Sequence, residues 1–584
     1  MDQVTVTING IQVSVPKGAT ILEAAKKIGI NIPTLCYCPD VGCGVANKPA
    51  SCRICLVEAT GIRPRPILAP ACATPIERDG IVVSTNSTRA LKARRTVLEL
   101  LLSDHPKNCL TCAKNQDCEL RKLAADFQIS EIPFQGESNR FPVDNSSEAI
   151  MRDLSKCIMC RRCETVCSSV QTVGALTAYG RGFSAKVGTA SMIPLADTSC
   201  TFCGQCVNAC PVGAITGISY VKKVWAAIND PSKTVIVQTA PAVRVAVGQE
   251  FGFEPGVPVT GKLVAGLRAI GFNKVFDTNF SADLTIMEEA NEIVARVKEG
   301  KDLPILTSCC PGWINFIEHN FPDLLHIPSS CKSPQQMFGA IAKSYYAAKI
   351  GVDPKDLIVV SIMPCQAKKY EAARPEFATD GVRDVDYVVT TRELCRMFQE
   401  AGVNLANMQD DEFDSPLGKS TGAADIFGVT GGVLEAALRT AYNIINGKDL
   451  AGDAINFRAV RGLDGVKEAK VEVAPGLILN VAAASGLGNA RKVLEMVQKE
   501  PGRFHAIEIM ACPGGCINGG GQPFLHGDTA LLDKRMKGLY SEDERKTMRM
   551  SHENPDIKAL YDEFLGTPGS EKAHHLLHTE YHQK

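Results

Sequence analysis

The sequence lacks three features that would each have indicated a simple functional class. Its 63 basic and 64 acidic residues leave a formal net charge of −1, so no overall field favours nucleic acid or an anionic membrane. No uninterrupted apolar run approaches the ~18 residues that a membrane-spanning helix needs. The N-terminal residues alternate like a strand and lack the basic and apolar regions of a secretory signal. We therefore expect a cytoplasmic protein with no membrane span and no nucleic-acid partner.

Nucleotide-binding motifs are also missing. There is no P-loop, and the segment GLGNARKV at residues 486–493 has no acidic residue downstream that would complete a dinucleotide fingerprint. We interpret this segment as a turn between a strand and a helix. Hydrophobic residues at 45% and charged residues at 22% exclude wholesale disorder. The length of 584 residues predicts about four domains at ~150 residues each.

Cysteine is what the sequence has in abundance. There are 24 cysteines, of which 17 lie between Cys36 and Cys210. An even number could indicate a disulfide scaffold, but such scaffolds are short and secreted, whereas this chain is long. Repeated C-x-x-C spacings in a reducing compartment indicate metal binding instead. The N-terminal third is therefore predicted to hold metal centres.

Residues 1–80 predict a small ferredoxin-like module. Residues 4–8 and 13–15 alternate like strands around an Asn-Gly turn, and Thr20 with Glu23 forms a capping box for a helix through about Ile28. Six cysteines follow, and four of them would ligate one [2Fe-2S] cluster. Cys52 and Cys55 are the secure pair because two intervening residues let both thiolates reach one cluster. The predicted set is Cys36, Cys52, Cys55 and Cys72, with Cys38 or Cys43 as alternatives to Cys36.

Residues 81–140 combine a basic amphipathic helix with a loop that carries one imidazole and three thiols. The loop residues at ligand spacing are His105, Cys109, Cys112 and Cys118. By spacing alone they could form a structural zinc site with three cysteine ligands and one histidine ligand. The neighbouring clusters favour an iron–sulfur cluster.

Residues 141–220 carry the most specific spacing in this part of the chain, C-x2-C-x2-C-x3-C, which occurs twice. The two runs are Cys157, Cys160, Cys163 and Cys167, and then Cys200, Cys203, Cys206 and Cys210. In two-cluster ferredoxins the fourth cysteine of each run ligates the other cluster. One cubane is thus assigned Cys157, Cys160, Cys163 and Cys210, and the other Cys200, Cys203, Cys206 and Cys167. Four cofactors in about 210 residues predict a path for single electrons.

From about residue 221 strands and helices alternate, which predicts an α/β domain with parallel pairing. Ligands of such sheets bind beyond the carboxyl ends of the strands. Three predicted strands end there in cysteine loops, which contain Cys309 with Cys310, Cys365, and Cys512 with Cys516. We infer that these thiols converge on one metal site. A cubane needs four of the five, and adjacent residues of an extended segment point opposite ways, so one of the first two stays free as a candidate acid–base group.

Three motifs carry a resemblance to a known family. They are TSCCPGW at residues 307–313, MPCQAKK at 363–369 and MACPGGCINGGGQP at 510–523, and together they resemble the signatures of the [FeFe]-hydrogenases. The resemblance covers essentially the whole chain. Size and layout are most similar to the catalytic subunit of cytoplasmic NADP-reducing, electron-bifurcating complexes, although single-chain members share the layout.

The resemblance implies a multidomain fold. Ferredoxin-type α+β modules would come first: a β-grasp [2Fe-2S] module at 1–80, a helical [4Fe-4S] module with one histidine and three cysteine ligands at 81–140, and a two-[4Fe-4S] module at 141–220. A large α/β hydrogenase domain would follow at 221–584 and include a C-terminal helical segment like the family's small subunit.

The resemblance also implies roles for individual residues. Those that match the ligands of the cubane half of the H-cluster are Cys310, Cys365, Cys512 and Cys516, the last bridging to a di-iron half with CO, cyanide and azadithiolate ligands. Lys368 matches a cation that holds a cyanide, with Gln335, Ser333, Met363 and Met510 around it. Cys309 resembles the thiol that passes protons to the bridging amine. The rest of the proton path is matched by Glu289, Ser329, Glu292 and Arg296.

The implied reaction is the reversible conversion of two protons and two electrons to H2. Its cofactors would be one [2Fe-2S] cluster, three accessory [4Fe-4S] clusters and the H-cluster. Expected partners are flavin- and NADP-binding and ferredoxin-like subunits of a hetero-oligomer, ferredoxin, and maturation proteins. The alternatives are a monomeric ferredoxin-dependent hydrogenase, a non-catalytic iron–sulfur assembly or H2-sensing protein, and a cluster subunit of a complex I-like or formate-oxidising enzyme, which would explain only the first 210 residues.

Overall fold

The computed structural model describes residues 2–584, and its N-terminal quarter is a five-stranded sheet followed by loops and helices. The sheet order is β2-β1-β5-β3-β4, from β1 (Gln3–Ile8), β2 (Ile11–Pro16), β3 (Leu56–Thr60), β4 (Ile67–Pro70) and β5 (Ile81–Ser84). Asn9 and Gly10 both have positive φ, which the tight turn between β1 and β2 requires. The capping box of Thr20 and Glu23 starts α1 (Ile21–Lys27), as predicted. Because β5 pairs with β1, the module extends past the expected boundary at residue 80.

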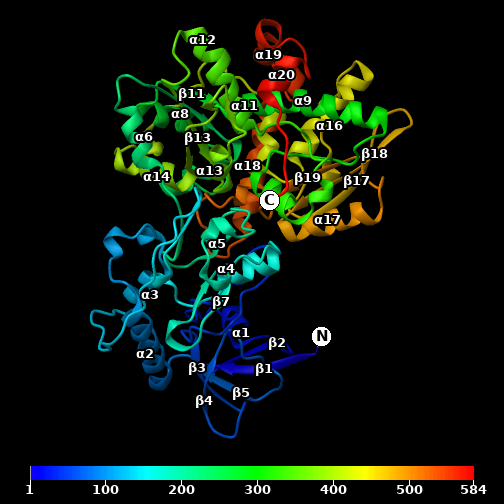
Figure 1. Ribbon diagram of the computed structural model, residues 1–584. Helices are drawn as coiled ribbons and strands as arrows, with labels where there is room; N and C mark the ends of the chain where they lie inside the picture. Colours follow the sequence, from blue (N-terminus) through cyan, green and yellow to red (C-terminus); the bar gives the residue numbers. More distant parts are fainter. Residues whose placement is uncertain (1) are drawn as a thin grey trace.

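The next two modules contain little regular structure. The segment with His105 and its three cysteines lies between α2 (Thr88–Asp104) and α3 (Glu119–Asp126). The two-cluster segment has two short antiparallel strand pairs, β6 (Ile150–Arg152) with β9 (Ile215–Gly217) and β7 (Thr177–Tyr179) with β8 (Lys186–Gly188). Its two short helices are α4 (Arg162–Thr165) and α5 (Gln205–Ala209). One apolar cluster joins all three modules and includes Ile54, Leu98, Leu120, Ile150 and Val207. In Figure 1 these modules form the narrow lower part of the molecule, in blue and cyan.

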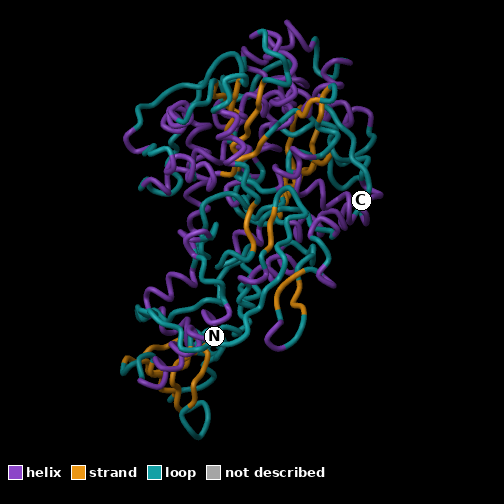
Figure 2. The backbone as a smooth tube through the Cα atoms, turned by 60° about the vertical axis from the view of Figure 1, so that its left-hand side comes forward, coloured by secondary structure: helices purple, strands orange, loops and turns teal. Residues whose placement is uncertain are grey.

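The remaining chain forms a larger lobe around two four-stranded sheets. The first sheet has the order β11-β10-β13-β16, is parallel throughout, and consists of β10 (Thr234–Thr239), β11 (Lys274–Asp277), β13 (Leu357–Met363) and β16 (Tyr387–Thr390). The second has the order β12-β19-β18-β17, from β12 (Ile305–Leu306), β17 (Val466–Ala474), β18 (Leu477–Ser485) and β19 (Ala506–Met510). The prediction of parallel pairing is wrong for β17, which runs antiparallel to β18. Figure 2 shows the strands of this lobe enclosed by helices.

Helix α9 (Thr278–Glu299) joins the cores of the two sheets. Phe280 and Leu284 belong to the core of the first sheet, whereas Ile286 and Ala290 belong to that of the second. It packs against α11 (Pro334–Ile341) and α16 (Gly432–Asn446). The other principal helices of the lobe are α6 (Val221–Ile228), α7 (Pro241–Arg244), α8 (Thr260–Ala269), α10 (Pro311–Asn320), α12 (Ala347–Ile350), α13 (Ala367–Ala373), α14 (Thr391–Glu400), α15 (Gly422–Asp425) and α17 (Leu487–Lys499). Gly486 alone separates β18 from α17, so the predicted strand–helix turn is at Gly486, and residues 487–493 already belong to α17.

The C-terminal segment forms α18 (Ala530–Arg545), α19 (Pro555–Leu560) and α20 (Glu571–Leu577). Its end is docked, because the Lys332 amide donates to the Leu577 carbonyl at 2.7 Å and the Thr579 amide donates to the Ser330 carbonyl at 2.8 Å. In Figure 1 helices α19 and α20, in red, lie beside α9 and α11. Within residues 2–584 no helix is long and apolar enough to cross a membrane.

Candidate metal centres and a cysteine-lined cavity

Four buried thiols of the first module lie together. The Cys36 amide donates to Cys52 Sγ at 3.3 Å, and the Cys55 and Cys72 Sγ atoms are 3.3 Å apart. The Cys52 and Cys72 thiols lower the pKa of Cys36 by hydrogen bonding to it. The loop that follows the first helix thereby faces the loop between β4 and β5. Four thiols in this arrangement are the donor set that a [2Fe-2S] cluster uses.

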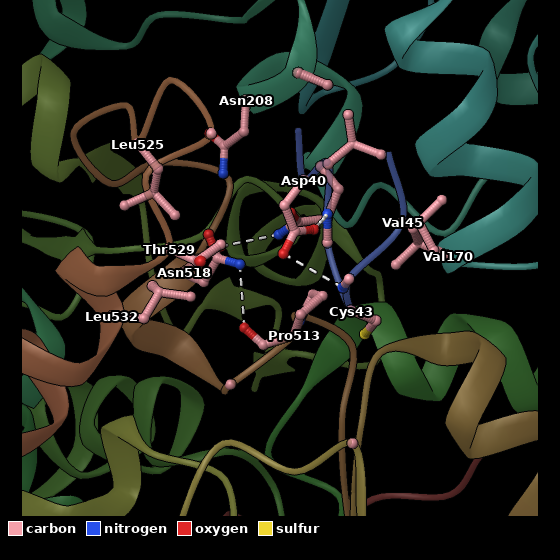
Figure 3. Close-up of a pocket in the computed structure, with 18 of the residues that line it drawn as sticks. Asp40, Cys43, Val45, Val170, Asn208, Pro513, Asn518, Leu525, Thr529 and Leu532 are labelled. Atoms are coloured by element: carbon pink, nitrogen blue, oxygen red, sulfur yellow. Dashed lines mark hydrogen bonds between the residues drawn. The ribbon is translucent and has the colours of Figure 1, made fainter. Parts of the chain in front are cut away.

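Cys38 and Cys43 lie elsewhere. Both line a separate cavity of about 930 Å³ between the first module and the large lobe. The Cys38 thiol donates to the Asp40 carbonyl at 3.2 Å, and Cys43 Sγ is 3.8 Å from Asn489 Nδ2. Figure 3 shows this cavity, with Asp40 and Cys43 on one wall and Leu525, Thr529 and Leu532 across from them.

The predicted ligands of the second module border a small cavity of their own, together with Gly213. The Nδ1 atom of His105 is buried without a hydrogen-bond partner. Burial, assisted by the positive charge of Lys156, lowers the pKa of His105 to about 4, so its ring is in the neutral form that binds a metal. A Cβ atom on Gly213 would lie 2.7 Å from Cys112 Sγ, so only glycine fits there. The donors present fit a metal cluster.

The two cysteine runs of the third module interleave. Burial raises the pKa of the Cys163 thiol, and Cys160, Cys210 and Cys157 raise it further through like charge. Burial also raises the pKa of the Cys206 thiol, with further contributions from Cys200, Cys203 and Cys167. The fourth cysteine of each run therefore lies near the other run.

Direct contacts connect the first module to the third, and the third to the large lobe. Asn47 Nδ2 donates to the carbonyls of Cys36 at 2.7 Å and Cys160 at 3.0 Å, which joins the first module to the third. Asn315 Nδ2 donates to the Cys200 carbonyl at 2.9 Å, which joins the third module to α10. A Cβ atom on Gly312 would lie 3.5 Å from the Cβ atom of Cys203. The segment with Cys200 and Cys203 thus lies beside α10, whose N-cap residue is Cys310.

Three cysteine loops meet between the two sheets of the large lobe. Cys309 and Cys310 follow β12, Cys365 follows β13, and Cys512 with Cys516 follows β19. Since β13 belongs to the first sheet and the other two strands to the second, the loops close a cavity from both sides. Eight of the predicted residues line this cavity: Cys309, Cys310, Cys365, Cys516, Met363, Met510, Gln335 and Lys368. Burial raises the pKa of Cys512, and Cys365 and Cys310 raise it further, so this thiol lies beside them.

Cys309 and Cys310 differ in the hydrogen bonds that they make. Cys310 begins α10, and its Sγ accepts the Ala511 amide at 3.4 Å. The carbonyl of Cys309 accepts a hydrogen bond from Lys368 Nζ at 3.0 Å. A Cβ atom on Gly519 would overlap the Pro364 carbonyl, so glycine is what lets the Cys516 loop pack against the Cys365 loop.

Glu371, which the sequence reasoning missed, connects three of the predicted residues. Lys368 Nζ donates to both of its carboxylate oxygens at 3.0 Å. Ser333 Oγ and Gln335 Nε2 each donate to Glu371 Oε2 at 2.9 Å. Gln335 Oε1 is buried without a partner. The only sequence signal was the spacing of three residues between Lys368 and Glu371, which places them on one face of α13.

The predicted proton-path residues are brought together on α9 and the strand-like segment before α11. Glu292 accepts hydrogen bonds from Ser329 Oγ at 2.7 Å and from Arg296 at 2.6 Å. Glu289 is 1% exposed, and its Oε2 has no partner. Burial, then the charges of Glu292 and Glu508, raise the pKa of Glu289 to about 8.

Two further cysteines, Cys331 and Cys395, are buried as predicted for core residues. Cys331 Sγ also lies 3.8 Å from Glu292 Oε2. All 24 cysteines lie in the described part of the chain, and none forms a disulfide. Among residues 2–584, no three His, Cys, Asp or Glu side chains converge closely enough to hold a single metal ion.

Profiles of known families match successive parts of the chain. They are described as 2Fe-2S iron-sulfur cluster binding domain at residues 1–88, NADH-ubiquinone oxidoreductase-G iron-sulfur binding region at 94–133, 4Fe-4S dicluster domain at 156–214, iron only hydrogenase large subunit, C-terminal domain at 233–520, and iron hydrogenase small subunit at 529–584.

Individual proteins are similar over most or all of the chain. The NADP-reducing hydrogenase subunit HndD of Solidesulfovibrio fructosivorans is 55% identical over 100% of both chains. Iron hydrogenase 1 of Clostridium pasteurianum is 40% identical over 99% of both. A solved structure of the [FeFe]-hydrogenase HydA1 from Chlamydomonas reinhardtii covers 63% of this chain and 99% of its own, with a TM-score of 0.56 and 45% identity.

Proposed function

Because this chain belongs to the iron-only hydrogenases, we propose that the cavity between its two sheets is where protons and electrons are interconverted with H2. The chain is a catalytic [FeFe]-hydrogenase with N-terminal 2Fe-2S and 4Fe-4S domains. The observation that carries the placement of the site is the convergence of three cysteine loops from two different sheets on one cavity.

The H-cluster is the group that this cavity would hold. Its cubane half would be ligated by Cys310, Cys365, Cys512 and Cys516, which supply the four thiolates that a cubane needs. Lys368, Gln335, Ser333, Met363 and Met510 would surround the di-iron half with its CO, cyanide and azadithiolate ligands. When bound, the cluster supplies the redox chemistry, and the protein supplies position, insulation and proton access.

Cys309 would be the last proton carrier. It borders the cavity but is not needed for ligation, and Glu289 contributes to its electrostatic environment. From there the path would run through Glu289, Ser329 and Glu292 to Arg296 on the same helix. A carboxyl with a pKa of about 8 carries a proton at neutral pH and can give it up, which suits a relay.

Electrons would arrive through the N-terminal modules. We propose one [2Fe-2S] cluster at Cys36, Cys52, Cys55 and Cys72, and three [4Fe-4S] clusters, one at His105 with its three cysteines and two at the interleaved runs. The hydrogen bond from Asn315 of α10 to the Cys200 carbonyl would bring the last of them close to the catalytic cavity.

The nucleotide would bind on another subunit. The similar HndD protein is named as a subunit of an NADP-reducing hydrogenase, and residues 487–493 here are the start of α17, which follows Gly486 directly. Flavin- and NADP-binding partner subunits, with a ferredoxin-like subunit or ferredoxin, would therefore complete the electron path, and maturation proteins would supply the di-iron group. Calorimetry on the isolated chain should detect no NADPH binding at micromolar affinity, and such binding would contradict this division.

The central experiment measures H2. Protein matured with the di-iron machinery should evolve H2 from reduced methyl viologen and show infrared bands of CO and cyanide. Protein from a host without that machinery should contain the accessory clusters but neither the bands nor the activity. Matured protein that holds iron yet makes no H2 would overturn the proposal in favour of a non-catalytic iron–sulfur protein.

A further inference from the structure

Glu371 is the point at which Lys368 and Gln335, which line the cysteine cavity, meet Ser333. It is 3% exposed and lies on α13, about one helical turn after Lys368. Its carboxylate accepts hydrogen bonds from Lys368, Ser333 and Gln335, all at 2.9–3.0 Å. These donors come from two separate segments, the start of α11 and α13 itself. A single acid therefore fixes one wall of the cavity.

We propose that Glu371 is a positioning residue for the di-iron half of the H-cluster, acting through Lys368, Ser333 and Gln335. This inference rests on the proposed function, since it takes those three residues to face the cluster. Glu371 itself would not ligate iron or touch the reacting atoms.

The first reason is charge. A buried ammonium without an anion is strongly disfavoured, and the Glu371 carboxylate, 3.0 Å from Lys368 Nζ, supplies that anion. Lys368 Nζ donates to the carboxylate of Glu371 and to the Cys309 carbonyl. A lysine reaches the cavity on a flexible four-carbon stem, so these partners are what hold its charge at one place.

The second reason is the direction of the hydrogen bonds. Ser333 and Gln335 each donate a hydrogen bond to Glu371. Glu371 therefore determines which of their other polar atoms are available to a group bound in the cavity. The amide oxygen of Gln335 is then left buried and unpaired. A buried acceptor in that state is costly unless a bound group supplies a donor. Removing the carboxylate would release both side chains to reorient.

The chain contains a matched control on the same helix. Lys369, the residue after Lys368, is paired with Glu393 at 2.7 and 2.8 Å, and this pair is also buried. Neither residue lines the cysteine cavity. Glu393→Gln thus removes the charge of a buried Lys–Glu pair without altering the cavity, and Gln can still serve the capping box of α14.

The experiment compares matured wild type, Glu371→Gln, Glu371→Asp and Glu393→Gln by iron content, thermal unfolding and infrared spectroscopy. Glu371→Gln removes the charge, and Glu371→Asp keeps it but is one methylene too short to reach all three donors. We expect both to shift or split the cyanide bands and to lower H2 evolution ~10- to 100-fold, since a ~1 Å misplacement can cost that much. Glu393→Gln should keep wild-type bands and turnover.

Wild-type bands in both Glu371 variants, with iron retained, would overturn the inference. So would failure of both variants to fold while Glu393→Gln folds, because Glu371 would then be a structural residue. An equal shift of the cyanide bands in Glu393→Gln would also contradict the inference, because the loss of any buried Lys–Glu pair would then produce the effect. If wild type itself shows no CO or cyanide bands, it is the proposed function that fails.

Discussion

The proposed N-terminal cluster sites and the proposed catalytic cavity would use the same ligand, cysteine thiolate, but they assemble it differently. At the N-terminal sites most of the proposed ligands are three or four residues apart in one short segment, as in the run from Cys157 to Cys167. In the cavity they come from three strand ends in two sheets, between Cys309 and Cys516. The first kind of site is specified by local spacing, whereas the second exists only when the whole lobe is folded.

The two regions also differ in what surrounds the thiols. Cys109 of the second module is exposed, whereas the thiols of the cavity are buried or partly buried. The cavity is bordered by apolar side chains and by Lys368, whose charge is matched by Glu371. A buried ion pair of that kind can fix the position of a side chain in addition to any role in binding the cofactor. The predictions below separate these roles.

The largest effects are expected from the adjacent cysteines of the cavity. Cys310→Ala should remove a ligand and lose the cluster, and with it all activity. Cys309→Ala should keep iron and the infrared bands, while turnover falls by several orders of magnitude. General acid–base transfer alone is worth ~10²–10⁴-fold, and loss of the last proton carrier adds to it.

Iron analysis, infrared spectra and H2 evolution of the two variants decide between ligand and proton carrier. Cys309→Asp should recover part of the activity because a carboxylate can also relay protons. If Cys309→Ala loses iron, or turns over like wild type, the two assignments are wrong.

The next largest effect concerns Glu289. Glu289→Gln keeps the shape of the side chain but cannot release a proton, so H2 evolution should fall ~10²–10⁴-fold. Glu288→Gln is the control, because Glu288 is the neighbouring buried acid but bonds to Tyr561 and His578 of the C-terminal segment. In wild type an ionisation near pH 8 should appear in the pH profile of turnover. Equal losses in both variants would mean that burial, and not proton transfer, explains the effect.

The sequence predicted the local parts of both regions and the convergence of the cysteine loops after β12, β13 and β19, but it missed other long-range contacts. The capping box of α1, the Asn-Gly hairpin and the cysteine spacings depend on neighbours in the chain, and they needed no tertiary information. The antiparallel β17–β18 hairpin and the division into two sheets did need it, because apolar runs do not specify pairing partners. Glu371 was missed for the same reason, since its partners Ser333 and Gln335 are distant in sequence.

A smaller effect is expected in the first module, where Cys36 and its alternatives can be separated. Cys36→Ala should abolish the electron paramagnetic signal of the [2Fe-2S] cluster and slow electron entry from a protein partner. Turnover with methyl viologen should persist, because this dye can also reduce the later clusters. Cys38→Ala and Cys43→Ala should leave the signal intact, since both thiols line the separate cavity. A lost signal in either variant, with an unchanged one in Cys36→Ala, would reverse the assignment.

The smallest effect is on stability, and it concerns Glu289, a buried acid on α9. Glu289 has a pKa of about 8 in the folded protein against the usual 4.5. Below pH 4.5 its carboxyl is protonated in both states, and between the two values only the folded state keeps the proton. Stability from this group therefore falls as pH rises through that window, by at most ~1.4 kcal/mol per pH unit, and the loss is complete above pH 8. Glu289→Gln removes the dependence, so its melting temperature relative to wild type should rise from pH 6 to pH 9. A difference that stays constant with pH would show that Glu289 is ionised throughout, and a proton relay would then have to start from another group.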